Sequence, residues 1–220
     1  MSDRLSFAKI SADEYLILRS ACHSIPPAKG NYLEPDFVSN LLLTVLDYQL
    51  KNVIVSRAYQ HFKTTRWDRI RTLNDLKVFL ARYPDNRAGN TQASQDLWGY
   101  KYWNRIEKLR RLVEFFESAG ITNQRELRRW AVEGDFESTF KGRVKGLGFA
   151  VYKWLTMRVG VETIKPDVHI LRFLEKTLGR RLGEQEAVGA LESVAKDLGL
   201  KAYELDWAIW EYDRGEAGTR

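Results

Sequence analysis

An all-α fold is predicted by three features of this 220-residue sequence. Apolar residues recur every three or four positions along most of the chain, which is the spacing of the buried face of a helix. Several of these segments begin with a capping residue and end at a glycine or before a proline. No two neighbouring segments show the alternation of apolar and polar residues that is typical of paired strands.

The first half of the chain begins with a capping box at 11–14, which predicts the first helix. The prolines and glycine of 25–31 end that helix and form a loop. Pro35 and Asp36 precede a segment over 37–46 that is apolar on nearly every side, so we expect this helix at the centre of the core. The remaining predicted elements of this half are helices over 51–63 and 73–82 and a polar loop over 84–94.

The second half begins with a long amphipathic helix that ends at Gly120. Its predicted buried face consists of apolar residues at helical spacing, namely Ile106, Leu109, Val113 and Phe116. The elements predicted after it are helices over 123–132 and 135–142, a double-glycine hairpin, a helix to about 159, a helix that begins at Asp167, and two last helices over 184–197 and 201–213.

Composition narrows the classes of function. The formal net charge of +6 favours an anionic partner, with nucleic acid first, although a basic balance also serves solubility alone. The single cysteine, Cys22, excludes a disulfide framework and a cysteine-ligated metal site, and the three scattered histidines predict no metal site. No apolar run is long enough to span a membrane, and the N-terminal residues lack the apolar core of a signal peptide. We therefore expect an intracellular protein, in the cytoplasm and nucleoid or in the nucleus.

The hairpin at 144–151 reads Val-Lys-Gly-Leu-Gly-Phe-Ala-Val. Its two glycines permit a tight turn, and the unpaired N–H groups at the start of the next helix attract a phosphate oxygen, with room for a monovalent cation between them. Leu147 would anchor the turn in the core, and Lys145 adds positive charge. The alternative is a plain turn between two helices that binds nothing.

A lone carboxylate, Asp167, follows Pro166 at a predicted helix start. Aspartate is a favoured N-cap residue, so a capping role explains it equally well, and the two roles are compatible. Beside a nucleotide, an ionised carboxylate stabilises the positive charge that develops on the sugar as a base departs, or activates a water molecule. We therefore expect the hairpin and Asp167 to share the rim of one cavity.

Two motifs carry a resemblance to a known family. Residues 144–148 resemble a Leu-Pro-Gly-Val-Gly pattern, and residues 166–172, Pro-Asp-Val-His-Ile-Leu-Arg, resemble a Val-Asp-x-His-x-x-Arg pattern at the matching separation. Residues 37–49 resemble the helix ahead of a lesion pocket, which ends in glutamine. These patterns belong to the helix-hairpin-helix DNA glycosylase superfamily (HhH-GPD), which contains endonuclease III and the adenine, 8-oxoguanine and alkylpurine glycosylases. The resemblance covers roughly residues 33–175.

The resemblance implies a two-lobed helical fold, with one lobe over 33–175 and the other formed by 1–32 and 176–220. It implies a monomer that binds duplex DNA, flips out a damaged or mismatched base and hydrolyses its N-glycosidic bond in base-excision repair. Asp167 would be catalytic, and Gln49 would fill the gap in the duplex unless it is an ordinary polar residue at a helix end. The implied hairpin contacts to DNA are Lys145, Gly146, Leu147, Gly148, Phe149 and Ala150.

Departures from the family pattern limit what is implied. Ala150 stands where members that also cut the strand carry a lysine that forms a Schiff base, so we expect a monofunctional enzyme. Lys153, one helical turn further on, leaves open a bifunctional glycosylase and lyase, and a non-catalytic DNA-binding protein is a further alternative. The cysteine cluster of the iron–sulfur branch is absent, so we expect no cofactor or metal other than a monovalent cation at the hairpin.

Aromatic residues that could stack on a flipped base alternate with basic residues over 98–105. Such a contact is worth about 1–3 kcal/mol, although core packing explains any single ring as well. The candidates are Tyr48, Trp98, Tyr102 and Trp154. Glu204 and Asp206 are candidates for a second carboxylate, but nothing in the sequence favours that role over surface charge, so we interpret them as surface charge. The identity of the lesion stays open among alkylated purines, oxidised purines, and uracil or thymine in mismatches.

Overall fold

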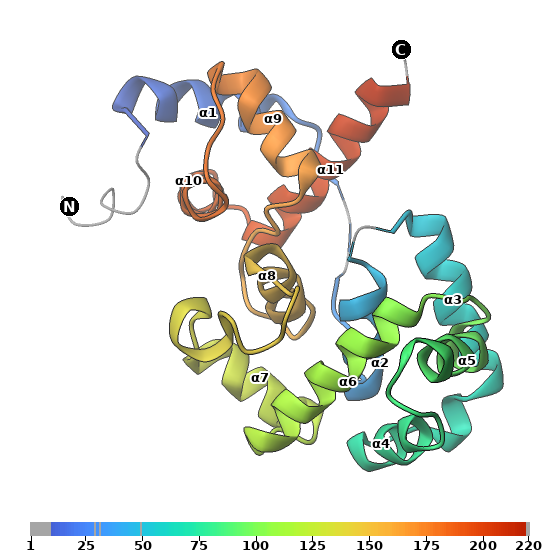
Figure 1. The fold of residues 1–220 in the computed structure, drawn as a ribbon. Coiled ribbons are helices and arrows are strands. Elements are labelled where there is room, and N and C mark those ends of the chain that lie inside the picture. The colour runs from blue at the N-terminus through green and yellow to red at the C-terminus, as the bar shows by residue number, and fades with distance from the viewer. Residues whose placement is uncertain (1–9, 29, 31, 49, 219–220) are drawn as a thin grey trace. The chain divides into compact units, whose positions relative to one another are not determined.

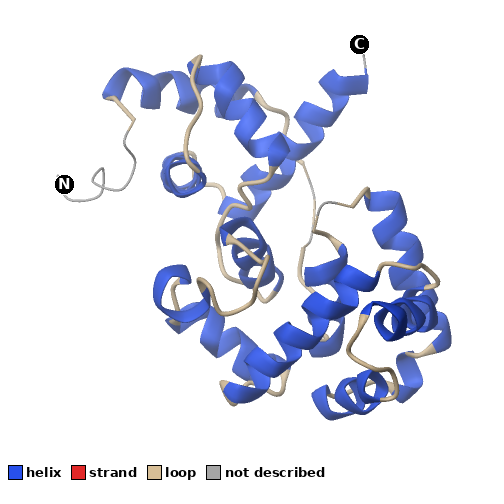
Figure 2. Cartoon of the chain, in the orientation of Figure 1, coloured by secondary structure: helices blue, strands red, loops and turns tan. Residues whose placement is uncertain are grey.

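The computed structural model describes residues 10–28, 30, 32–48 and 50–218. Every regular element in these ranges is a helix (Figure 2), which confirms the predicted all-α class. None of the helices in this described part combines the length and hydrophobicity that a bilayer crossing requires.

The chain divides into two compact units (Figure 1). Unit 1 contains Met1–Leu33 and Tyr152–Arg220, and unit 2 contains Glu34–Val151. The C-terminal boundary of unit 2 therefore lies after residue 151, whereas the resemblance implied a lobe that extends to residue 175. The physical reason is that α9 (Val168–Leu178) packs against α1 (Ala12–Ser24) and α11 (Ala202–Gly218), so the chain has already joined the terminal helices before residue 175.

Unit 2 is built around α2 (Phe37–Leu46), in which nearly every residue is buried. Its N-cap is Asp36, whose carboxylate accepts a hydrogen bond from the Ser39 N–H. The predicted central helix is thus confirmed. Around it lie the other elements of unit 2, which are α3 (Asn52–Thr65), η2 (Trp67–Arg69), α4 (Leu73–Ala81), α5 (Arg87–Trp98), α6 (Trp103–Ser118), α7 (Gln124–Glu133) and the short π-helical turn η3 (Phe136–Phe140).

The prediction of a polar loop over 84–94 is wrong, because most of this segment belongs to α5. Asn86 caps the helix by accepting a hydrogen bond from the Gly89 N–H at 2.9 Å. The face of α5 toward the core carries small residues such as Ala93 and Ser94, which let the helix pack against α6. A helix buried through small and polar side chains lacks the apolar spacing on which the loop prediction depended.

Unit 1 is formed by α1, α9, α10 (Glu184–Asp197) and α11. The predicted capping box of α1 is present, since Ser11 and Glu14 exchange backbone and side-chain hydrogen bonds. α8 (Phe149–Arg158) begins at the end of unit 2 and continues into unit 1. Fully buried leucine and isoleucine side chains, including Leu18, Leu174 and Ile209, form the core of unit 1.

Candidate functional site

The double-glycine hairpin of unit 2 is a turn anchored by two apolar side chains. Val144 and Leu147 are buried, and the Leu147 N–H donates to the Val144 carbonyl at 3.1 Å. Gly146 has a φ of +80°, a conformation that residues with a Cβ adopt only under strain. Lys145 is exposed between these anchors. The turn therefore holds its backbone rigidly while presenting a lysine to solvent.

A second lysine, Lys108 of α6, lies against this turn. A Cβ added to Gly146 would sit 3.1 Å from the Lys108 Cε atom. The Lys108 ammonium is 5.7 Å from the ring centroid of Tyr48, and the Arg105 guanidinium is 5.2 Å from the same ring. Lys108 has no acidic partner within the described residues. Lys108 is an addition to the residues predicted for this site, because its contact with the hairpin depends on how α6 packs within unit 2.

The other aromatic candidates of unit 2 have different environments. Trp98 is completely buried in α5, so it belongs to the core and has no face on which a base could stack. Tyr102 is partly exposed, with its ring centroid 5.7 Å from that of Tyr100. Tyr48 is also partly exposed. Gln49, which the resemblance places in the DNA gap, lies outside the described residues.

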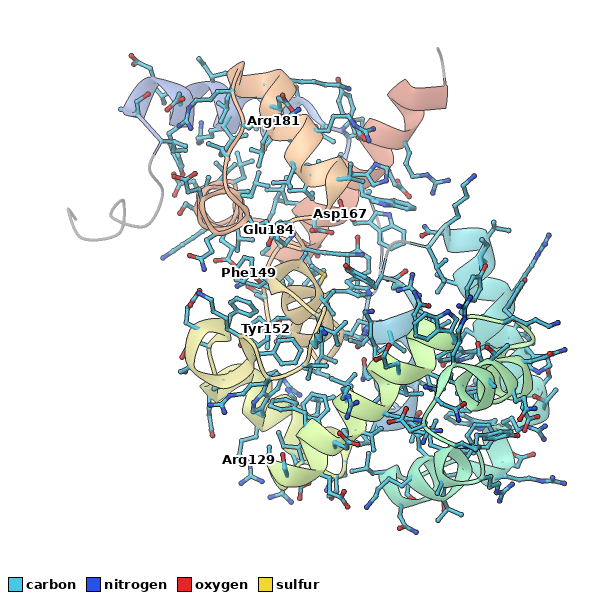
Figure 3. All side chains as sticks on the ribbon, viewed as in Figure 1. Arg129, Phe149, Tyr152, Asp167, Arg181 and Glu184 are labelled. Atoms are coloured by element: carbon cyan, nitrogen blue, oxygen red, sulfur yellow. The ribbon has the colours of Figure 1, made fainter. Side chains whose placement is uncertain are left out.

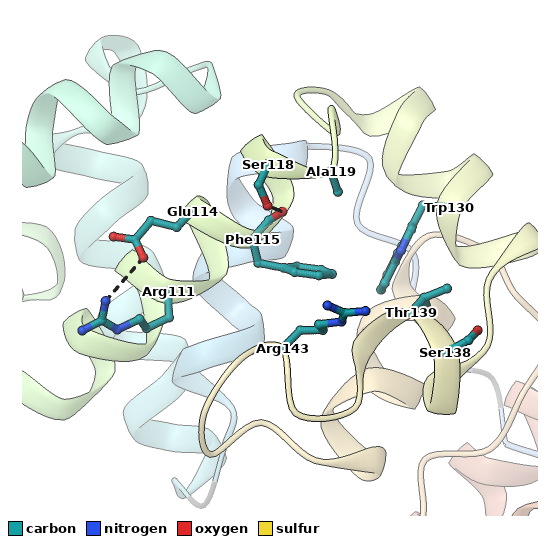
Figure 4. A pocket seen from close by; sticks show the side chains of 9 residues that line it. All are labelled: Arg111, Glu114, Phe115, Ser118, Ala119, Trp130, Ser138, Thr139 and Arg143. Carbon is teal, nitrogen blue, oxygen red and sulfur yellow. Dashed lines mark hydrogen bonds and ion pairs between the residues drawn. The ribbon is translucent and has the colours of Figure 1, made fainter.

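Unit 2 also has an open depression of about 660 Å³ (Figure 4). Arg143, which directly precedes Val144, extends its side chain over Phe115 and toward Trp130. Arg111 pairs with Glu114 at the opposite side, at 3.4 Å. Two arginines against one glutamate make the lining positive. The complete lining is Arg111, Glu114, Phe115, Ser118, Ala119, Trp130, Ser138, Thr139 and Arg143.

Asp167 of unit 1 lies at the start of α9 (Figure 3). Its Oδ1 atom accepts hydrogen bonds from the N–H groups of His169 at 2.9 Å and Ile170 at 3.3 Å, which makes it the N-cap. Its Oδ2 atom lies 3.8 Å from the Lys165 ammonium. The side chain is 23% exposed, so it is not sealed in the interior. The helix thus uses one carboxylate oxygen and leaves the other facing a lysine.

The Lys165 side chain lies against a group of aromatic side chains. The Lys165 ammonium lies 4.3 Å from the Trp154 ring centroid, and the Tyr32 ring is 4.9 Å from Trp154 and 4.8 Å from Trp207. We call Tyr32, Trp154, Trp207 and Trp210 the aromatic cluster. The indole N–H groups of Trp154 and Trp207 are buried, and neither has a hydrogen-bond partner within the described chain. The cluster therefore contains two buried donors that no described residue satisfies.

A second carboxylate, Asp206 of α11, is buried beside the cluster. Its Oδ1 atom accepts the backbone N–H of Lys165 at 2.8 Å, and its Oδ2 atom accepts the Tyr32 hydroxyl at 3.0 Å. Burial raises the pKa of Asp206 to about 7, and the negative charge of Asp167 contributes to the rise. Interpreting Asp206 as surface charge was wrong. Its spacing from Leu205 and Ile209, on the buried face of the helix, was the signal that could have found it.

The remaining polar residues of the Asp167 motif have structural partners. The His169 Nδ1 atom lies 2.8 Å from the Asp213 carboxylate, and an Arg172 Nη1 atom lies 2.9 Å from it. Lys176 approaches the same carboxylate at 3.5 Å. Asp213 itself is buried, with only 1% of its side chain exposed. These contacts join α9 to α11 and fix the helix that Asp167 caps.

Lys153, the alternative lyase residue, is held by an acidic partner. Its ammonium lies 3.6 Å from the Glu192 Oε1 atom, and its side chain is only 20% exposed. The same Glu192 oxygen accepts the Thr163 hydroxyl at 2.6 Å. Because an ammonium paired with a carboxylate has no free electron pair, this arrangement disfavours Lys153 as a nucleophile.

Comparison with known proteins gives one match. The sequence profile of a family described as "Domain of unknown function (DUF8548)" matches residues 46–214, a range that includes the hairpin, Asp167 and Asp206. Neither the curated proteins nor the solved structures contain a match to this sequence.

Proposed function

Because the chain belongs to the DUF8548 family, described as a domain of unknown function, we propose its activity from its own residues. We propose a monofunctional DNA glycosylase with the two-lobed HhH-GPD fold, which removes a damaged or mismatched base from duplex DNA. The observation that carries this proposal is the environment of Asp167, a carboxylate with one oxygen free of the helix that faces Lys165, whose ammonium lies over the Trp154 ring. A partly exposed carboxylate near aromatic surfaces suits the excision of a flipped base.

The chemistry needs only a water molecule and Asp167. As the bond between the base nitrogen and the sugar C1′ breaks, its electron pair leaves with the base and positive charge develops on the sugar, which the carboxylate stabilises. The water oxygen then bonds to C1′, and its proton passes to the Asp167 carboxylate. The departing base takes up a proton from solvent. The product is an abasic site in an uncut strand.

Release of the base is the direct test. Duplexes that carry alkylated purines, oxidised purines, or uracil or thymine in mismatches are incubated with the protein and then heated in alkali, which cuts the strand at abasic sites. The same duplexes heated without protein give the background from lesions that are themselves labile. Cleavage of one duplex class supports the proposal and identifies the lesion. If the protein binds these duplexes but none is cleaved, the non-catalytic DNA-binding alternative replaces it.

We expect the hairpin to hold the DNA backbone, so the Gly146→Ala variant should bind duplex DNA about tenfold more weakly. The added Cβ forces a left-handed backbone to relax and displaces Lys108, a strain of about 1–2 kcal/mol. Wild-type affinity should also fall steeply with salt, because phosphate contacts release counterions. Fluorescence anisotropy with a labelled duplex at several salt concentrations measures both effects.

Gly142→Ala is the matched control for this experiment. Gly142 has nearly the same φ, +73°, but a Cβ there would meet nothing within 4 Å. Both substitutions strain the backbone, and only the one at Gly146 should weaken DNA binding. Equal affinity losses in the two variants would mean that strain, and not a phosphate contact, explains the result.

The bifunctional alternative predicts a covalent adduct through Lys153. Since Glu192 holds this ammonium, we expect no adduct when borohydride is added to the protein during base release. A known glycosylase that also cuts the strand serves as the positive control for trapping. An adduct that forms in wild type and disappears in Lys153→Gln would establish the lyase and overturn the monofunctional assignment.

A further inference from the structure

Asp206 organises the segment that leads into Asp167. Its Oδ1 atom accepts the Lys165 backbone N–H at 2.8 Å, and the Lys165 carbonyl accepts the Asp167 N–H at 2.7 Å. The Lys165 side chain turns to the Asp167 Oδ2 atom at 3.8 Å. One lysine therefore joins the two carboxylates, through its backbone to Asp206 and through its ammonium to Asp167.

The hydrogen bonds of Asp206 persist whether or not it carries a proton. Oδ1 accepts from a backbone N–H in both states. Tyr32 can donate its hydroxyl proton to an ionised Oδ2 atom, or accept a proton from a neutral carboxyl group, because a phenol does either. Gaining or losing the proton therefore changes the charge of this buried site and leaves its geometry in place.

The titratable groups that act on the pKa of Asp206 are Tyr32, Lys165 and Asp167, and they shift this pKa in opposite directions. Lys165 and the Tyr32 hydroxyl favour the ionised form, whereas Asp167 and burial favour the neutral form. These influences place the pKa of Asp206 at about 7, so its charge changes in the neutral range.

We propose that Asp206 is a positioning residue whose proton controls how firmly Lys165 is held on Asp167. When Asp206 is neutral, the Lys165 ammonium is drawn to Asp167 and neutralises it. When Asp206 is ionised, two carboxylates share one ammonium, and the free oxygen of Asp167 is released to face the sugar. The inference rests on the proposed glycosylase function. It predicts that the protein with ionised Asp206 releases the base faster than the protein with neutral Asp206.

The Asp206→Asn variant removes the negative charge of this side chain and can keep its hydrogen bonds. The amide oxygen can still accept the Lys165 N–H and the amide nitrogen can donate to Tyr32, so both contacts survive while the titration is lost. Glu211→Gln is the matched control, because Glu211 is an exposed carboxylate on the same helix. Tyr32→Phe gives a second variant that alters the titration without removing it.

The first measurement follows the protonation of Asp206 and does not depend on base release. Protein labelled with 5-fluorotryptophan is titrated by ¹⁹F NMR, with the Trp207 and Trp154 resonances assigned by Trp→Phe variants. We expect the Trp207 resonance to shift with a midpoint near pH 7 in wild type and in Glu211→Gln, and to stay fixed in Asp206→Asn. Tyr32→Phe should raise the midpoint, because it removes a donor to the ionised form.

The second measurement is the single-turnover rate of base release against pH. With an ionised group of pKa about 7 in the active form, the wild-type rate at pH 8 should exceed the rate at pH 6 by about tenfold. Asp206→Asn should stay near the low-pH rate throughout, and its affinity for DNA should be unchanged. Glu211→Gln should follow wild type.

The outcomes distinguish the two proposals. If no duplex is cleaved while the Trp207 resonance still titrates, the glycosylase proposal fails and the protonation of Asp206 stands. If bases are released but the pH profile is the same in Asp206→Asn and wild type, the inference is overturned and the enzyme remains. If Asp206→Asn does not fold, an unchanged midpoint in Tyr32→Phe overturns the inference instead.

Discussion

Asp167→Asn is expected to slow base release by about 10²–10³-fold while leaving the fold and DNA binding intact. This is the loss found when one preorganised group that stabilises transition-state charge is removed. Asparagine caps helices about as well as aspartate, so its side-chain oxygen can keep the hydrogen bonds from the His169 and Ile170 N–H groups. The variant therefore removes the negative charge and little else.

Single-turnover excision, DNA affinity and thermal unfolding should be measured together on this variant. Asp36→Asn is the matched control, because Asp36 is also an N-cap aspartate, at the start of α2 in unit 2. It should retain the wild-type excision rate. A full rate in Asp167→Asn would remove this residue from catalysis. Parallel losses of rate and folding stability would reduce its role to capping.

Local signals in the sequence were sufficient for most helices and for the two motifs. The capping box of α1, the apolar run of α2 and the cap at Asp167 act over a few residues, so they can be read directly from the chain. The capping role of Asp167 followed from its position after Pro166, whereas its catalytic role rests on the resemblance and stays a prediction. What the sequence could not supply is which oxygen the helix occupies and what faces the other.

The missed features depend on contacts between distant segments. α5 is held by packing of small residues against α6, which hydrophobic periodicity does not detect. Lys108 contacts the hairpin from α6, and Asp206 contacts Tyr32 and Lys165, which lie 174 and 41 residues away along the sequence. A buried carboxylate is rare enough that a surface position is the natural expectation until its partners are seen.

Asp206 should also affect folding stability in a way that depends on pH. Below about pH 4 its carboxyl group is protonated in both the folded and the unfolded chain, and it contributes no difference. Between about pH 4 and 7 the unfolded chain loses this proton while the folded protein keeps it, so stability falls as pH rises. Raising the pKa from 3.8 to about 7 costs the folded state up to about 4 kcal/mol above pH 7.

Asp206→Asn should therefore become more stable than wild type as pH rises, with a difference close to zero at pH 4 and up to about 4 kcal/mol at pH 8. Urea unfolding at each pH measures it, and subtracting the two proteins cancels the titration of all other groups. Glu211→Gln should show no such trend. A difference that is constant with pH would mean that Asp206 is ionised throughout. A stabilised but slow variant would show that this buried acid is kept at the expense of stability, as functional groups often are.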